Sequence, residues 1–200
     1  MKLQLTSPYT ESVSQVHEPS TTRDSSPSQQ PRWLAPQERD AWLRLVGVVI
    51  KLPTALDAQL QRDAGISLFE YQVLAGLSEA PDRMLRMSDL AELTNGSLSR
   101  LSHVVKRLGS RGWVRREPCP EDGRSTNAIL TDEGLAKITA TAPGHVDTVR
   151  RLVIDALTAA QVRSLREIGT RILQQVDPAD TFRLRRAAPD APAPGQERSR

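Results

Sequence analysis

Apolar side chains recur every three to four positions through most of residues 36–176, and this spacing predicts a mainly helical chain. The first helix is expected to begin at Pro36, because proline suits a first helical turn, and to bend at Pro53. Ser67 and Glu70 have the spacing of a capping box, which predicts that a second helix starts there.

A short helix over residues 88–93 and a turn over residues 94–96 are expected to precede a fourth helix with two contrasting sides. Ser97 stands where an N-cap side chain is preferred. The apolar positions are three and four residues apart and predict one buried stripe of Leu101, Val104, Val105 and Leu108. The opposite side is polar or basic and carries Ser99, His103, Lys106 and Ser110. This helix has the pattern of a recognition helix, whose first turns meet base edges while longer cations reach phosphates.

After Gly112 the apolar pattern changes to that of strands. Residues 113–118 and 126–130 predict an antiparallel pair joined by a turn over residues 120–124. A hairpin directly after a recognition helix is typical of a wing. Arg124 at the expected tip would enter a minor groove, with Asp122 holding it in position.

Two long amphipathic helices are expected to close the folded region. Thr131, followed by two acidic residues, predicts the start of the first, which the spacing continues to residue 157 with a bend at Pro143 and Gly144. Thr158 with Gln161 repeats the capping-box spacing and predicts the last helix. Because a single winged helix needs neither apolar stripe, we expect them to pack against each other and against a second copy of the chain.

The two ends of the 200-residue chain differ in composition from its centre. Residues 1–32 are rich in Ser, Thr, Pro and Gln and predict a disordered tail, while residues 177–200 are rich in Pro, Ala and Arg and predict a flexible one. No apolar run approaches the ~20 residues of a membrane span. Residues 1–10 lack the apolar segment of a secretory signal, so we expect a cytoplasmic protein without a membrane partner.

The formal net charge is only +3, but the cations concentrate in one segment. Residues 97–116 contain no Asp or Glu and six basic residues, namely Arg100, Lys106, Arg107, Arg111, Arg115 and Arg116. A basic run alone often forms a solvated helix face. Here it coincides with the polar side of the fourth helix and with the hairpin, and this combination favours binding to double-stranded DNA.

Sequence patterns of the common enzyme classes are missing. The chain contains no G-x-S-x-G, H-E-x-x-H, P-loop or G-x-G-x-x-G pattern. Its three histidines are far apart and Cys119 is its one cysteine, so neither an internal disulfide nor a ligand set for a structural metal is expected. A binding protein without a cofactor is therefore predicted, rather than an enzyme.

The folded region, from LAPQERDAW (residues 34–42) to the last expected helix, resembles the MarR family of bacterial transcriptional regulators. The most specific part runs from Met87 to Gly134 and reads MSDLAELTNGSLSRLSHVVKRLGSRGWVRREPCPEDGRSTNAILTDEG. Five features of the family occur in order: a DLA helix (residues 89–91), a basic-Leu pair ending the recognition helix (107–108), an RGxVxR step from Arg111, a D-x-R wing tip (122–124) and an LTxxG opening of the next helix (130–134). Each is weak alone, but together and in order they are specific.

The resemblance implies a mainly α homodimer whose two winged helix-turn-helix domains bind a pseudo-palindromic operator. Residues 36–62 and 132–176 would supply the dimerisation helices, and residues 63–131 the DNA-binding domain. The residues implied to contact DNA are Ser97, Ser99, Arg100, His103, Lys106, Arg107, Asp122 and Arg124. Ser99, Arg100 and His103 would discriminate bases, while Lys106 and Arg107 would bind the DNA backbone. Many relatives differ at residues 100 and 103, so the resemblance gives no base preference.

The resemblance also implies a ligand-responsive repressor, in which a small aromatic or anionic effector enters a cleft between the dimerisation helices and the DNA-binding lobe. The candidate lining residues are Trp42, Val46, Phe69, Tyr71, His145 and Val149. Each also lies in a helical apolar stripe, so ordinary core packing is the alternative. Two other functions stay open: a redox-sensing regulator, in which Arg115 and Arg116 favour the Cys119 thiolate, and a winged module that binds protein instead of DNA.

Overall fold

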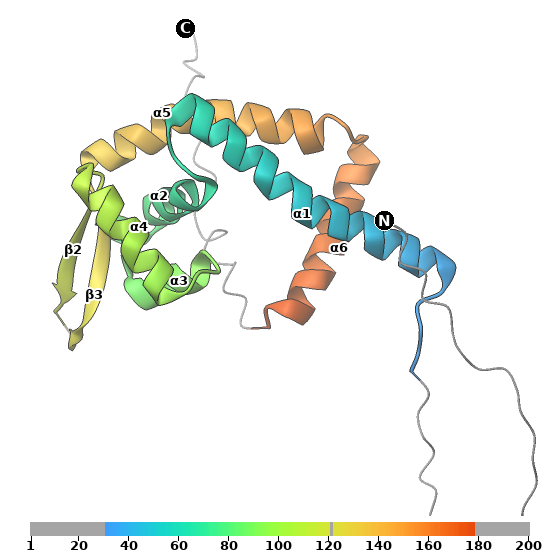
Figure 1. Cartoon of the computed structure of the whole chain (residues 1–200), viewed down its shortest axis with the longest axis horizontal. Helices are drawn as coiled ribbons and strands as arrows, with labels where there is room; N and C mark the ends of the chain where they lie inside the picture. Colours follow the sequence, from blue (N-terminus) through green and yellow to red (C-terminus); the bar gives the residue numbers. More distant parts are fainter. Residues whose placement is uncertain (1–30, 121, 179–200) are drawn as a thin grey trace, which may run out of the picture. The chain divides into compact units, whose positions relative to one another are not determined.

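The computed structural model of the chain describes residues 31–120 and 122–178, apart from the side chain of Arg124. The predicted tails therefore lie almost wholly outside the described residues. Within the described part the chain is mainly helical, as predicted, with one small antiparallel sheet (Figure 1). In chain order the elements are α1 (Pro36–Ala64), α2 (Leu68–Glu79), a 3-10 turn η1 (Pro81–Arg83), β1 (Met84–Arg86), α3 (Met87–Leu93), α4 (Leu98–Ser110), β2 (Val114–Cys119), β3 (Asp122–Leu130), α5 (Asp132–Val149), a π turn η2 (Arg150–Ile154) and α6 (Ala159–Val176).

The described residues divide into two units, one that ends at Ala41 and one that begins at Trp42. In the first unit α1 begins at Pro36, as predicted. The Ala35 N–H donates to the Glu38 carboxylate at an N–O distance of 2.8 Å. An acidic side chain in the first turn is also favourable beside the positive end of the helix dipole.

The core of the second unit is formed by the end of α1, by α2, α3 and α4, and by one face of the sheet. Its largest fully buried side chains are Leu60, Ile66, Val73, Leu74, Leu77, Leu90, Leu101, Val105 and Leu108. Val114, Ala128 and Leu130 from the strands and Ile138 from α5 join the same cluster. The predicted buried stripe of α4 is confirmed, since each of its four residues is at most 6% exposed.

The sheet has three strands in the order β1-β3-β2, and both pairs are antiparallel. Strand β1 pairs Leu85 with Ala128 in β3 and runs directly into α3. The sequence pattern does not predict β1, because three residues are too few to show the alternation of a strand. Its pairing with β3 attaches the first helix of the helix-turn-helix to the base of the hairpin.

The hairpin differs from its prediction at the tip. Strand β3 begins at Asp122, and Asp122 pairs with Cys119, so the turn predicted over residues 120–124 is wrong. Two residues connect the strands, a common length for a hairpin loop. The pairing register shifts between Pro118 and Cys119, as in a β-bulge. Such an irregularity allows part of the predicted turn, residues 122–124, to belong to a strand.

The four predicted N-caps are confirmed. The hydroxyls of Ser67, Ser97, Thr131 and Thr158 each accept a hydrogen bond from a backbone N–H in the first turn of α2, α4, α5 and α6. Ser67–Glu70 and Thr158–Gln161 also form complete capping boxes. Among the described residues, none of the helices has the length and apolar character that a membrane span needs.

Helix α1 continues through Pro53, and α5 continues through Pro143 and the following glycine, without a break in either element. The bends expected at these prolines stay predictions. A π turn of residues Arg150–Ile154 follows α5. The regular helix predicted to residue 157 is therefore wrong at its end. An ion pair between Arg150 and Asp155, at 2.8 Å, closes this segment.

Candidate nucleic-acid interface

Helix α4 presents an exposed polar side with no acidic residue on it. Ser97 caps the helix by accepting a hydrogen bond from the Arg100 N–H at 3.2 Å. The residues predicted to meet DNA from this helix are exposed, namely Ser97, Ser99, Arg100, His103, Lys106 and Arg107. Because the opposite side is buried in the core, the chain itself fixes which side faces outward.

The turn between α3 and α4 is closed at short range by Gly96. The Gly96 N–H donates to the Ala91 carbonyl at 2.9 Å, and the Thr94 hydroxyl donates to the Leu90 carbonyl at 2.8 Å. A Cβ atom at Gly96 would lie 2.7 Å from the Phe69 ring, which is closer than real contacts allow. The missing side chain therefore allows α2 to pack against the start of α4.

Five of the six clustered cations have intramolecular partners. The Arg100 guanidinium lies 4.1 Å from the centre of the Phe69 ring, and Arg107 pairs with Glu70 at 2.8 Å. The other pairs are Arg111 with Glu70 at 3.9 Å, Arg115 with Glu117, and Arg116 with the Ser102 carbonyl at 2.6 Å. Within the described part of the chain Lys106 has no hydrogen-bond or ion-pair partner, so it is the cation most available to a phosphate.

Glu70 is the residue that sequence reasoning placed only as a cap. Its side chain is 4% exposed and meets the basic side of α4. Burial alone would raise the pKa of Glu70, but hydrogen bonds from the Ser67 backbone, the Arg107 guanidinium and the Ser67 hydroxyl outweigh it and lower that pKa. The capping-box spacing predicts the contact of Glu70 with the Ser67 backbone. No sequence signal predicts the contact with Arg107, which is 37 residues away.

The hairpin is attached to α4 through Arg116. Its guanidinium in β2 donates to the Ser102 carbonyl in α4, and the two elements lie beside each other (Figure 1). Asp122, at the start of β3, accepts a hydrogen bond from the Ser125 hydroxyl at 2.7 Å. The side chain of Arg124 lies outside the described residues, so its expected pairing with Asp122 is untested.

Cys119 is buried, with 5% of its surface exposed, at the end of β2. Reactive cysteines are typically accessible, so its burial gives no support to a redox-sensing role.

The residues expected to line an effector cleft only partly come together. Tyr71 in α2 and His145 in α5 lie with ring centres 4.3 Å apart, and His145 Nδ1 is 3.3 Å from Gln59 Oε1 in α1. Burial lowers the pKa of His145. Phe69 instead contacts Gly96 and Arg100. Trp42 is 54% exposed, and Val46 and Val149 are half-buried.

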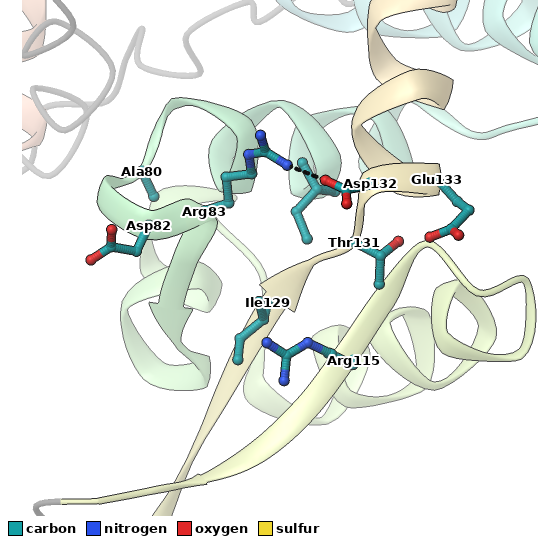
Figure 2. Close-up of a pocket in the computed structure, with 9 residues that line it drawn as sticks. Ala80, Asp82, Arg83, Arg115, Ile129, Thr131, Asp132 and Glu133 are labelled. Atoms are coloured by element: carbon teal, nitrogen blue, oxygen red, sulfur yellow. Dashed lines mark hydrogen bonds and ion pairs between the residues drawn. The ribbon is translucent and has the colours of Figure 1, made fainter.

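A separate polar pocket lies on the other face of the sheet (Figure 2). Val114 points into the core, so its neighbour Arg115 points to the opposite face, into this pocket. There the Arg83 guanidinium pairs with the Asp132 carboxylate at 2.8 Å (Figure 2). The pocket combines cations with carboxylates and is lined by none of the residues predicted to bind DNA or an effector. No cluster of metal-ligating side chains occurs among the described residues.

Comparison with known proteins gives consistent matches. A sequence model of the MarR family matches residues 64–125. The transcriptional regulator PecS of Dickeya dadantii is 30% identical over 114 residues, which are 54% of this chain and 68% of PecS. Sco3205, a MarR family regulator from Streptomyces coelicolor solved in complex with DNA, is 46% identical with a TM-score of 0.71, over 76% of this chain and 96% of Sco3205. AbsC, a MarR family regulator from the same organism, is 37% identical with a TM-score of 0.68, over 74% and 99% of the two chains.

Proposed function

Because the chain belongs to the MarR family of transcriptional regulators, which are not enzymes, we propose that it is an operator-binding repressor that acts as a homodimer. The observation that carries this proposal is helix α4, which buries its apolar stripe and exposes an acid-free polar side next to the hairpin. The similarity to Sco3205, whose structure was solved with DNA, supports the same assignment.

In the proposed complex, α4 enters a major groove of the operator and the wing reaches the adjacent minor groove. Ser99, Arg100 and His103 read base edges, and Ser97 contacts DNA at the start of the helix. Lys106 and Arg107 bind phosphates, and Asp122 with Arg124 forms the wing contact. Two such surfaces related by a twofold axis would occupy successive major grooves ~34 to 36 Å apart, which is why we propose a pseudo-palindromic operator.

The homodimer is supported by apolar side chains that the described chain leaves uncovered. In the second unit, Trp42, Val49 and Ile50 of α1 are 54 to 63% exposed. In α6, Ile168 is 55% and Val176 is 70% exposed. Large apolar patches of this kind mark interfaces, and a second copy of the chain offers the same faces to pack against.

A small aromatic or anionic effector is proposed to bind beside Tyr71 and His145. The Tyr71–His145 ring contact and the His145–Gln59 contact bring α1, α2 and α5 together, so a compound bound there would contact the proposed dimerisation helices α1 and α5 as well as α2 of the DNA-binding domain. Such a compound changes DNA binding only if it prefers one spacing of the two wings, because equal affinity for both spacings shifts no population.

The test is selection of bound fragments from random duplex DNA by the purified full chain. We expect a motif with twofold symmetry, and a log affinity that falls steeply with log salt because several phosphates are neutralised. Arg124→Ala should flatten that salt slope, whereas Arg100→Ala should relax the base preference at one position. Selection without any motif, or salt-insensitive binding, would contradict the proposal and favour a winged module that binds protein.

A further inference from the structure

A buried carboxylate lies directly beneath the basic side of the recognition helix. Glu70 is the one charged residue among the buried residues of the described chain. An ionised carboxylate is expensive to bury unless charged or hydrogen-bonding partners surround it, so its partners reveal what it does.

Two of those partners are arginines that α4 and its C-cap supply. The Arg107 Nε–H donates to Glu70 Oε1 at 2.8 Å, and the nearest Arg111 nitrogen is 3.9 Å from the same oxygen. The side chains of Arg107 and Arg111 remain 51% and 38% exposed. The Arg111 guanidinium also donates to the Gly65 carbonyl at 3.3 Å and lies 5.1 Å from the centre of the Trp113 ring. Both arginines are therefore restrained from within the chain and are still partly exposed to solvent.

The position of Glu70 is itself set by α2. Its Oε2 accepts hydrogen bonds from the Ser67 N–H at 2.7 Å and from the Ser67 hydroxyl at 2.9 Å. The next N–H, that of Leu68, donates to Asp57 of α1 at 2.7 Å. The Glu70 side chain is therefore held in one position at the start of α2, and its ion pair with Arg107 links α2 to α4.

We infer that Glu70 is a positioning residue for sequence recognition: it fixes Arg107 and withholds part of the positive charge of α4 from non-specific DNA. The inference rests on the proposed DNA-binding function. Phosphate contacts by cations give affinity for any sequence, while base contacts give discrimination. A buried acid that restrains two cations beside the base-reading side chains lowers the affinity for any sequence. It also orients the side chains that make base contacts.

The chain itself offers an isosteric test. At Thr158–Gln161, which starts α6, a glutamine makes the same capping box, with Gln161 Oε1 accepting from the Thr158 N–H at 2.8 Å and from its hydroxyl at 3.1 Å. Glu70→Gln should therefore keep the α2 cap and remove only the charge that holds Arg107. Gln161→Glu is the matched control, since it adds the acid to a capping box at the start of another helix.

The measurement is the affinity of the full chain for a duplex selected from random DNA and for a scrambled duplex of equal length, over a salt series. For Glu70→Gln we expect tighter binding to the scrambled duplex and a slope of log affinity against log salt that is steeper by about one unit, because the carboxylate that offsets one of the arginine charges is removed. We also expect the ratio of selected to scrambled affinity to fall about fivefold or more. Gln161→Glu should leave both the slope and the ratio unchanged.

Two further variants separate positioning from stability. In the double variant Glu70→Gln with Arg107→Gln, the salt slope should return toward that of the original chain, because the cation released by the first change is then absent. Arg107→Lys keeps the charge but not the planar guanidinium geometry, so it should lower the ratio with little change in slope, and it tests the inference even if Glu70→Gln fails to fold.

Two results would overturn the inference while leaving the proposed function intact. One is equal weakening of both duplexes by Glu70→Gln at an unchanged slope. The other is an unchanged affinity ratio in Arg107→Lys. If the unsubstituted chain selects no sequence at all, the failure is that of the proposed function, and the selection step reports it before any variant is made.

Discussion

Helices α4 and α6 are both amphipathic and both start at a hydroxyl cap, but their apolar sides have different surroundings. The stripe of α4 is at most 6% exposed. In α6, Leu165, Ile168, Ile172, Leu173 and Val176 are 40 to 70% exposed. An amphipathic pattern therefore leads to burial for α4, whereas the stripe of α6 stays largely exposed among the described residues.

This difference agrees with the separate tasks proposed for the two regions. A recognition helix must present its base-reading side chains in a fixed geometry, which burial of its other side provides. A dimerisation helix must keep its apolar side available until the second copy binds.

The same Leu-to-Ala change should have very different consequences in the two helices. Leu101→Ala removes a side chain that is 0% exposed and should lower the free energy of unfolding by about 2 to 5 kcal/mol, through lost burial and the cavity left behind. Leu165→Ala, at 45% exposure, should lower it only at protein concentrations where dimers form. Urea unfolding at two protein concentrations measures both. A concentration-independent loss in Leu165→Ala equal to that of Leu101→Ala would contradict the division.

A charge on the apolar side of α6 should separate the two copies without unfolding either. Ile168→Asp places a carboxylate where the partner's apolar side chains are proposed to pack, and dimers should weaken by at least about a hundredfold, in line with the ~3 kcal/mol or more typical of an uncompensated charge at an interface. Light scattering across a dilution series gives the mass. Gln174→Asp, on the exposed polar side of the same helix, is the control and should leave the dimer intact. Equal masses for both variants and the original chain would show that this face is not the interface.

Local signals predicted most of the fold, because they operate within one or two helical turns. The caps at Ser67 and Thr158, the buried stripe of α4 and the change to strands after Gly112 were all predictable from neighbouring residues. Strand β1 was not, since it is formed only by pairing with β3. The hairpin tip was also mispredicted, because pairing register is settled between strands and not by turn composition alone.

The site was harder to predict than the fold, for the same physical reason. The segment of residues 97–116 contains no acid, so its cations appeared free. The fold then brings Glu70 beneath Arg107 and places Arg100 on the Phe69 ring. Those contacts join residues about 30 or more positions apart, and a charge count along the chain contains no information about them.

Two Gly-to-Ala changes should have opposite signs. At Gly96 a Cβ would lie 2.7 and 2.9 Å from atoms of the Phe69 ring, so Gly96→Ala should destabilise by about 1 to 3 kcal/mol and disturb the start of α4. At Gly169 in α6 no atom lies within 4 Å of the added Cβ, and Gly169→Ala should stabilise by about 0.5 to 1 kcal/mol through its helix propensity. Thermal unfolding in dilute solution measures both. If the stabilisation by Gly169→Ala disappears at concentrations where dimers form, the backbone of the partner must lie close to residue 169.

The smallest effect expected is a pH dependence located at His145. Burial holds the pKa of His145 below the value of about 6.5 that an unfolded chain has, so as the pH falls the unfolded state takes up the proton first. The contribution of neutral His145 to the unfolding free energy is therefore fully present above about pH 7, and it is lost as the pH falls through the lowered pKa. Glu70 does not interfere above about pH 5, because its own lowered pKa keeps it ionised there.

Urea unfolding at several pH values between 8 and 5 tests this assignment. His145→Gln cannot titrate, so the difference in unfolding free energy between it and the original chain should shrink or reverse as the pH falls. A difference that stays constant for His145→Gln would mean that the Tyr71–His145 contact tolerates the charged ring, and that protonation there does not oppose the packing of α5 on α2.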